Sequence, residues 1–145
     1  MKLTENFALL EFERSDTARQ HNIDNKVPET VLPNVRKLAE FLQELRDKLG
    51  TRITISSGYR SMPLNRLVGG AGMSQHTQGL AADIHAKGFT AEELFQKIIE
   101  LDLDYDQVIQ EFGRWVHVSV SLDKPRKQKI RATKNSAGKT VYTTV

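Results

Sequence analysis

The chain has 145 residues, enough to bury the core of one ordinary domain, and we predict a single domain over residues 1–145. It contains no cysteine, which excludes disulfides and cysteine-rich structural zinc sites. No apolar run is long enough for a signal peptide or a membrane span, so we expect no membrane partner. We therefore expect a protein that stays in the cytosol or leaves it by a route that needs no signal.

The net charge of +3 is distributed unevenly. Residues 124–145 hold seven Lys/Arg and no Asp/Glu, whereas the first 123 residues hold 14 basic and 18 acidic side chains. A basic tail suits nucleic acid, and it equally suits a polyanionic surface such as a bacterial cell wall. A solvated basic face on an ordinary strand pair explains the same pattern more simply.

Two helices are indicated in the first third of the chain. Ser15 is a suitable N-cap for a short helix that ends before Asn22. A longer amphipathic helix lies within residues 28–50, with its regular part beginning at Pro33 and Gly50 stopping it. Its apolar side chains recur every three or four residues, as in a core-facing helix: Val31, Val35, Leu38, Leu42, Leu45 and Leu49.

A strand is predicted over residues 52–56, which alternate and are rich in β-branched residues. Arg60 follows it on a glycine-containing turn, where its fork of donors is well placed to grip a carboxylate. Judged by its position alone, Arg60 is more simply a surface arginine than a carboxylate-binding one. A helical turn after Pro63 and a flexible loop at residues 68–72 follow, and this loop lacks the pattern of a phosphate-binding loop.

The sequence of the second half of the chain predicts most of the strands of a sheet. A short strand covers residues 81–85, on which Ala81, Asp83 and His85 share one face. A capping box at Thr90–Glu93 starts a helix. The remaining strands are a hairpin joined at Gly113-Arg114 and a pair around residues 135–138: 107–112, 115–120, 129–133 and 140–145. We predict an α+β fold, with an antiparallel sheet covered by the helices at 33–50 and 90–100.

Three residues from separate segments form a candidate metal site: His76, Asp83 and His117. Two imidazole nitrogens and one carboxylate oxygen bind zinc and leave the fourth position open, as in catalytic zinc sites. Taken singly, each residue is more simply a packed or surface side chain. The combination predicts a zinc hydrolase.

The motif Ser74-x-His76-x-x-Gly79-x-Ala81-x-Asp83, followed by Trp115-Val116-His117, resembles that of the zinc peptidases of bacterial and phage cell-wall metabolism. These include D-alanyl-D-alanine carboxypeptidases and dipeptidases and the L-alanyl-D-glutamate endopeptidases of phage lysins. The stretch Ser57-Gly58-Tyr59-Arg60-Ser61 is similar to their arginine motif. The resemblance runs from about Phe7 to the end of the chain and is closest to the small phage and prophage-type branch. It implies a hedgehog/DD-peptidase-like fold.

The resemblance implies the hydrolysis of a peptide bond in the stem or cross-link peptide of bacterial peptidoglycan. It makes His76, Asp83 and His117 the ligands of one Zn²⁺ per chain. Arg60 would act in catalysis and hold the substrate, and Ser74 would line the substrate site. We expect a monomer whose partner is a peptidoglycan peptide and which, if it is a phage-type lysin, stays cytoplasmic until it is released to the wall. His85 has no counterpart and is interpreted as a support for Asp83 or a wall of the groove.

One departure concerns the general base. Many members of the family carry the catalytic carboxylate three residues before the last histidine, where this chain has Arg114. The nearest carboxylate is Glu111, which the hairpin should return opposite Val116 or His117. We therefore expect Glu111 to act as the catalytic base. The alternative is that Glu111 is structural and the base lies elsewhere or is missing.

Other functions remain open at this point. A non-catalytic, zinc-containing module that binds the cell wall or forms part of a phage particle would explain Arg114. Nucleic-acid binding rests on the basic tail alone, and Tyr142 is the tail's one aromatic residue, so we expect no nucleic-acid partner. Another zinc hydrolase, such as an amidase, would use the same ligand set.

Overall fold

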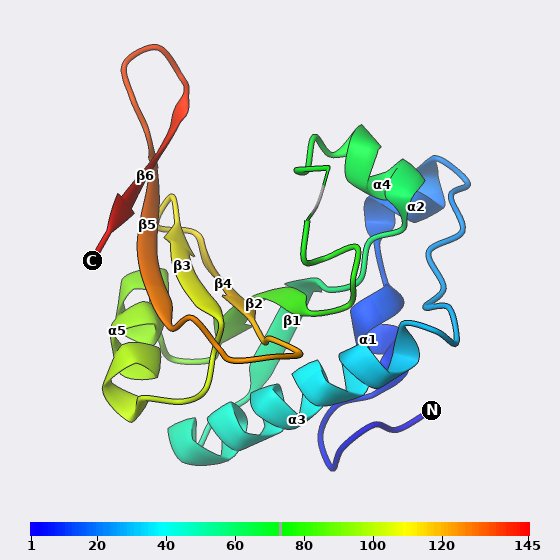
Figure 1. Cartoon of the computed structure of the whole chain (residues 1–145), viewed down its shortest axis with the longest axis horizontal. Helices are drawn as coiled ribbons and strands as arrows, with labels where there is room; N and C mark the ends of the chain where they lie inside the picture. The colour runs from blue at the N-terminus through cyan, green and yellow to red at the C-terminus, as the bar shows by residue number, and fades with distance from the viewer. Residues whose placement is uncertain (73) are drawn as a thin grey trace.

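The computed structural model describes residues 1–72 and 74–145, which form an α+β arrangement with a six-stranded sheet (Figure 1). The helices are α1 (Leu9–Glu13), α2 (Asp16–Gln20), α3 (Leu32–Leu49), α4 (Met62–Leu67) and α5 (Ala91–Leu101). The strands are β1 (Ile53–Ser57), β2 (Ala81–Ala86), β3 (Gln107–Glu111), β4 (Trp115–Ser119), β5 (Gln128–Lys134) and β6 (Thr140–Thr144). All the predicted helices and strands are present, with small differences at their ends.

The sheet has the order β1-β2-β4-β3-β5-β6 and is mixed, so the prediction of a purely antiparallel sheet is wrong. Four neighbouring pairs are antiparallel, but β5 runs parallel to β3. The cause is the path of the chain after β4. Residues 120–127 cross past the start of β3, where Asp106, just before β3, binds Arg126. β5 then pairs with the edge of β3 opposite β4.

The helix ends follow local sequence signals. Ser15 caps α2 by accepting a hydrogen bond from the Ala18 N–H, as predicted. α3 begins at Leu32, one residue before the predicted start, and ends at Gly50, whose φ of 71° is in the left-handed region. The capping box predicted at Thr90 and Glu93 is present at the start of α5. α1 is a further short helix that periodicity did not indicate.

One face of the sheet belongs to the apolar core. α5 packs against β2, β3 and β4 (Figure 1), and its apolar side chains join those of α3 in one cluster. The strand residues of this cluster are all buried: Ile53, Ile55, Ala82, Ile84, Ala86, Val108, Val116 and Val118. Polar side chains occupy much of the rest of α3. In the described ranges, no helix combines the length and hydrophobicity that crossing a bilayer requires.

The turn between β3 and β4 differs from the prediction. Phe112 is outside the strand, and the turn has three residues, with Phe112 (φ 60°) and Gly113 (φ 68°) in the left-handed region. Glu111 therefore pairs with Trp115, not with Val116 or His117 as expected.

The basic tail forms the β5–β6 hairpin, which projects beyond the ends of the other strands (Figure 1). Three of its cations pair with acidic residues of the body of the protein: Arg126 with Asp106, Lys127 with Asp102, and Arg131 with Glu92. Part of the positive charge of the tail is therefore used to hold the hairpin in place.

Candidate metal centre

The fold brings His76, Asp83 and His117 together, and one ligand atom from each lies within 4.8 Å of the others. Asp83 Oδ1 is 3.4 Å from His76 Nε2 and 3.3 Å from His117 Nδ1. The two imidazole rings meet edge to face, with their centroids 5.1 Å apart. All three side chains are buried. Two nitrogens and one carboxylate oxygen converging on one point suit a zinc ion.

Two elements of the fold create this convergence. Asp83 on β2 and His117 on β4 are direct partners in the antiparallel ladder, so their side chains stand beside each other on one face. His76 comes from the loop before β2. Gly79 closes that loop with a φ of 73°, and an added Cβ would meet side-chain carbons of Val31 and Val35 at 2.7 and 2.8 Å. The glycine therefore lets the loop lie directly against α3 and its N-cap.

The orientation of His76 is set by the main chain. Its Nδ1 lies 2.8 Å from the carbonyl oxygen of Gly58. A carbonyl only accepts hydrogen bonds, so Nδ1 carries the proton and donates it, which leaves the lone pair of Nε2 facing Asp83. Metal-binding histidines usually make such an outer hydrogen bond. Sequence reasoning missed this role of Gly58, because no residue spacing reports a contact with a carbonyl group.

Asp83 provides a test of whether a metal fits. Its Oδ1 is buried and has no hydrogen-bond partner among the described residues, although it faces both imidazoles. A buried carboxylate oxygen without a partner is costly, and a cation at this point would satisfy it. The donor set therefore fits zinc.

Arg60 is held in place beside this cluster. Its Nε donates to Ser57 Oγ at 3.1 Å and one terminal nitrogen donates to Asn65 Oδ1 at 3.3 Å. The other terminal nitrogen lies 3.5 Å from Asp83 Oδ2. A guanidinium has five N–H donors, so two remain for a ligand in the groove that Arg60 lines. Asn65, buried within α4, is a second supporting residue that sequence reasoning missed.

Glu111 lies next to the cluster. Its Oε1 is 3.8 Å from His117 Nδ1, because Glu111 and His117 are diagonal neighbours on the same face of the β3–β4 pair. Burial raises the pKa of the Glu111 carboxyl, and the negative charge of Asp83 adds to the effect. A carboxyl shifted in this direction is better suited to proton transfer near neutral pH. Arg114 is exposed in the turn and lies outside the groove that these residues line.

The cluster lies on the wall of a groove of about 620 Å³. The loop at residues 68–71 lines one part of the groove, and Lys134 and Tyr142 of the β5–β6 hairpin line another. Ser74 also lines the groove, and its hydroxyl accepts a hydrogen bond from the His76 N–H at 3.2 Å. His85 is exposed and is not among the lining residues, so the interpretation of His85 as a groove wall is wrong.

Asp106 connects the histidine loop to the tail. Its carboxylate accepts a hydrogen bond from Gln75 Nε2 at 2.9 Å and is bound by the backbone and side chain of Arg126. Pairing with Arg126 lowers the pKa of Asp106 to about 2. Gln75 precedes His76, so this buried carboxylate helps to hold the loop that carries a candidate ligand. No sequence signal links Asp106 to Gln75.

Comparison with known protein families gives a match over most of the chain. The family model described as peptidase M15 matches residues 5–119. The match includes the three candidate ligands, Arg60, Ser74 and Glu111, and it ends before β5 and β6. No curated protein matches the chain.

Proposed function

Because the chain belongs to the peptidase M15 family, whose members are zinc-dependent metallopeptidases, we propose that it hydrolyses a peptide bond in the stem or cross-link peptide of bacterial peptidoglycan. The observation that carries the proposal is the convergence of His76, Asp83 and His117 on the wall of an open groove, with Glu111 beside them. Both a D-Ala-D-Ala carboxypeptidase-like and an endolysin-like endopeptidase activity fall within it. Peptidoglycan stems carry free carboxylates, which suits a groove containing Arg60.

The three clustered residues would hold the zinc ion. His76 would bind through Nε2, because its Nδ1 is engaged by Gly58. Asp83 would bind through Oδ1, the atom without a hydrogen-bond partner among the described residues. When bound, Zn²⁺ supplies Lewis acidity toward the scissile carbonyl and the attacking water.

Glu111 and Arg60 perform the remaining chemistry. Glu111 accepts a proton from the attacking water and passes it to the leaving amine nitrogen as the C–N bond breaks. Its raised pKa suits both transfers. The two unused N–H groups of Arg60 stabilise the developing oxyanion or anchor a substrate carboxylate. Because Ser57, Asn65 and Asp83 already hold the guanidinium, little reorganisation is needed when the substrate binds.

Metal analysis beside digestion of purified peptidoglycan tests the proposal. We expect about one zinc per chain and new peptide termini, which mass spectrometry of the fragments would assign to a particular bond. Zinc without cleavage of any peptidoglycan would favour the non-catalytic wall-binding module. A protein that takes up no zinc, even after reconstitution, would contradict the central role of the cluster.

A further inference from the structure

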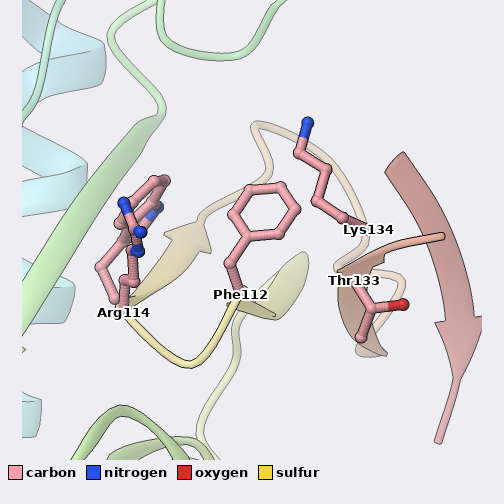
Figure 2. A pocket seen from close by; sticks show the side chains of 5 residues that line it. Phe112, Arg114, Thr133 and Lys134 are labelled. Carbon is pink, nitrogen blue, oxygen red and sulfur yellow. The ribbon is translucent and has the colours of Figure 1, made fainter. Parts of the chain in front are cut away.

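A hollow of about 540 Å³ adjoins the groove at the β3–β4 turn. Figure 2 shows it from close by, and its lining residues are Phe112, Arg114, Trp115, Thr133 and Lys134. Phe112, Trp115 and Lys134 also line the groove that contains the metal cluster. The hollow is therefore continuous with the groove.

The hollow combines an aromatic wall with cationic groups. The rings of Phe112 and Trp115 meet edge to face, with their centroids 5.9 Å apart. Lys134 Nζ lies 5.1 Å from the centre of the Phe112 ring. In Figure 2 the Phe112 ring stands between Arg114 on one side and the Lys134 side chain on the other. A ligand here would contact apolar surface and positive charge together.

The two cations are available to a ligand. Among the residues that the structure describes, neither Arg114 nor Lys134 forms an ion pair, and Lys134 Nζ has one hydrogen bond, to Thr140 Oγ1 at 3.2 Å. Within residues 1–72 and 74–145, no carboxylate lines the hollow. The charge of the hollow is therefore positive and suits an anionic group.

Lys134 belongs to a part of the chain outside the family match, which ends at residue 119. Its strand is nonetheless fixed to the body, because Arg131 makes two hydrogen bonds to Glu92 of α5, at 2.7 and 3.2 Å. Arg126 holds the start of the same hairpin through Asp106. The hairpin is thus anchored well enough to present Lys134 at a defined place beside the groove.

We propose that this hollow is a specificity subsite that takes a carboxylate-bearing aliphatic branch of the peptide substrate. The aliphatic part contacts Phe112 and Trp115, and the carboxylate pairs with Lys134, while Arg114 on the other side of the Phe112 ring adds positive charge. The inference rests on the proposed function, because the substrate is taken to be a peptidoglycan peptide. It goes further in assigning substrate selection to the β3–β4 turn and the β5–β6 hairpin.

Trp115 is the sole tryptophan of the chain, so intrinsic fluorescence reports binding at the hollow. The test titrates the Glu111→Gln protein with a peptidoglycan stem peptide and with versions amidated at one free carboxylate in turn. We expect one amidation to weaken binding about tenfold in low salt. In the Lys134→Gln, Arg114→Gln variant that difference should largely disappear. Lys139→Gln is the matched control, since Lys139 is exposed on the same hairpin but lines neither cavity.

The outcomes separate this inference from the proposed function. Charge-dependent binding that Lys134→Gln, Arg114→Gln removes supports the subsite, even if the unmodified protein cleaves no peptidoglycan. If every amidated peptide binds as tightly as the parent peptide, the subsite assignment is wrong, whether or not cleavage occurs. It is also wrong if Lys139→Gln has the same effect as the double variant, or if the double variant weakens all the peptides equally.

Discussion

The Nδ1 atom of His76 lies 2.8 Å from the carbonyl oxygen of Gly58, and this single contact determines which nitrogen of the ring faces the metal cluster. Gly58 follows β1, whereas His76 lies in the loop before β2. The backbone N–H of Arg60 also donates to the His76 carbonyl oxygen at 3.1 Å, so the two segments are bound to each other twice. The ring is therefore oriented by the protein itself.

Gly58→Ala should disturb this orientation. An added Cβ would lie 2.8 Å from both the Cα and the carbonyl oxygen of Phe12, so the backbone must move. We expect zinc affinity to fall roughly 10–100-fold, as for other losses of an outer partner of a ligand. Stability should fall by about 1–3 kcal/mol. Zinc titration and urea denaturation measure the two effects. Gly72→Ala is the control, since its Cβ would meet none of the described atoms within 4 Å.

Removal of a candidate ligand should have a larger effect on zinc binding. His117→Ala and Asp83→Asn each take away one of three donors, so we expect neither variant to retain stoichiometric zinc after dialysis. His85→Ala should bind zinc normally, because His85 is exposed and faces no part of the groove. Elemental analysis decides the matter. Equal zinc in all the proteins would show that the metal binds elsewhere.

Glu111→Gln should separate metal binding from turnover. Glutamine has nearly the same shape as glutamate but cannot accept and return a proton, so kcat should fall about 10²–10⁴-fold while zinc content stays unchanged. Hydrolysis of a stem peptide and metal analysis are measured on the same preparation. Glu100→Gln makes the same substitution at an exposed position of α5 and serves as the control, with unchanged kcat and zinc content expected. Full activity of Glu111→Gln would remove this residue from the mechanism.

Asp106→Asn should destabilise the protein in a pH-dependent way. The pKa of Asp106 is about 2 in the folded chain, below its ordinary value of 3.8. Its ionised form therefore stabilises the folded state above about pH 4, and this stabilisation is lost as the pH falls through about 2. Since Arg126 is half exposed, we expect a difference of about 1–2 kcal/mol between wild type and variant at neutral pH.

Urea denaturation of both proteins at several pH values measures this difference. The free energies of unfolding should converge as the pH approaches 2. Asp16→Asn provides the comparison, since Asp16 pairs with Arg19 on the open surface and should contribute little at any pH. A difference between Asp106→Asn and wild type that does not change with pH would mean that the Asp106 charge is not responsible.

Local signals in the sequence predicted much of the fold. The repeat of apolar residues located α3, the capping box located the start of α5, and alternation located β1. These elements depend on side chains a few residues apart, so the sequence alone is enough to recognise them. The motif around β2 likewise named the three candidate ligands, and ladder pairing of Asp83 with His117 then placed two of them together.

The tertiary structure decided what depends on the path of the chain. β5 lies parallel to β3 because residues 120–127 cross past the start of β3, where Arg126 is bound by Asp106, and no local pattern encodes that path. The left-handed backbone at Phe112 set the register that makes Glu111 a diagonal neighbour of His117. The same turn places Arg114 outside the groove of the metal cluster and on the wall of the hollow that Lys134 also lines. Residue type and spacing thus determined the candidate chemistry. Strand order and the β3–β4 turn decided which side chains lie close enough to take part in it. Contacts between residues far apart in the sequence form only when distant segments pack, so local patterns do not predict them.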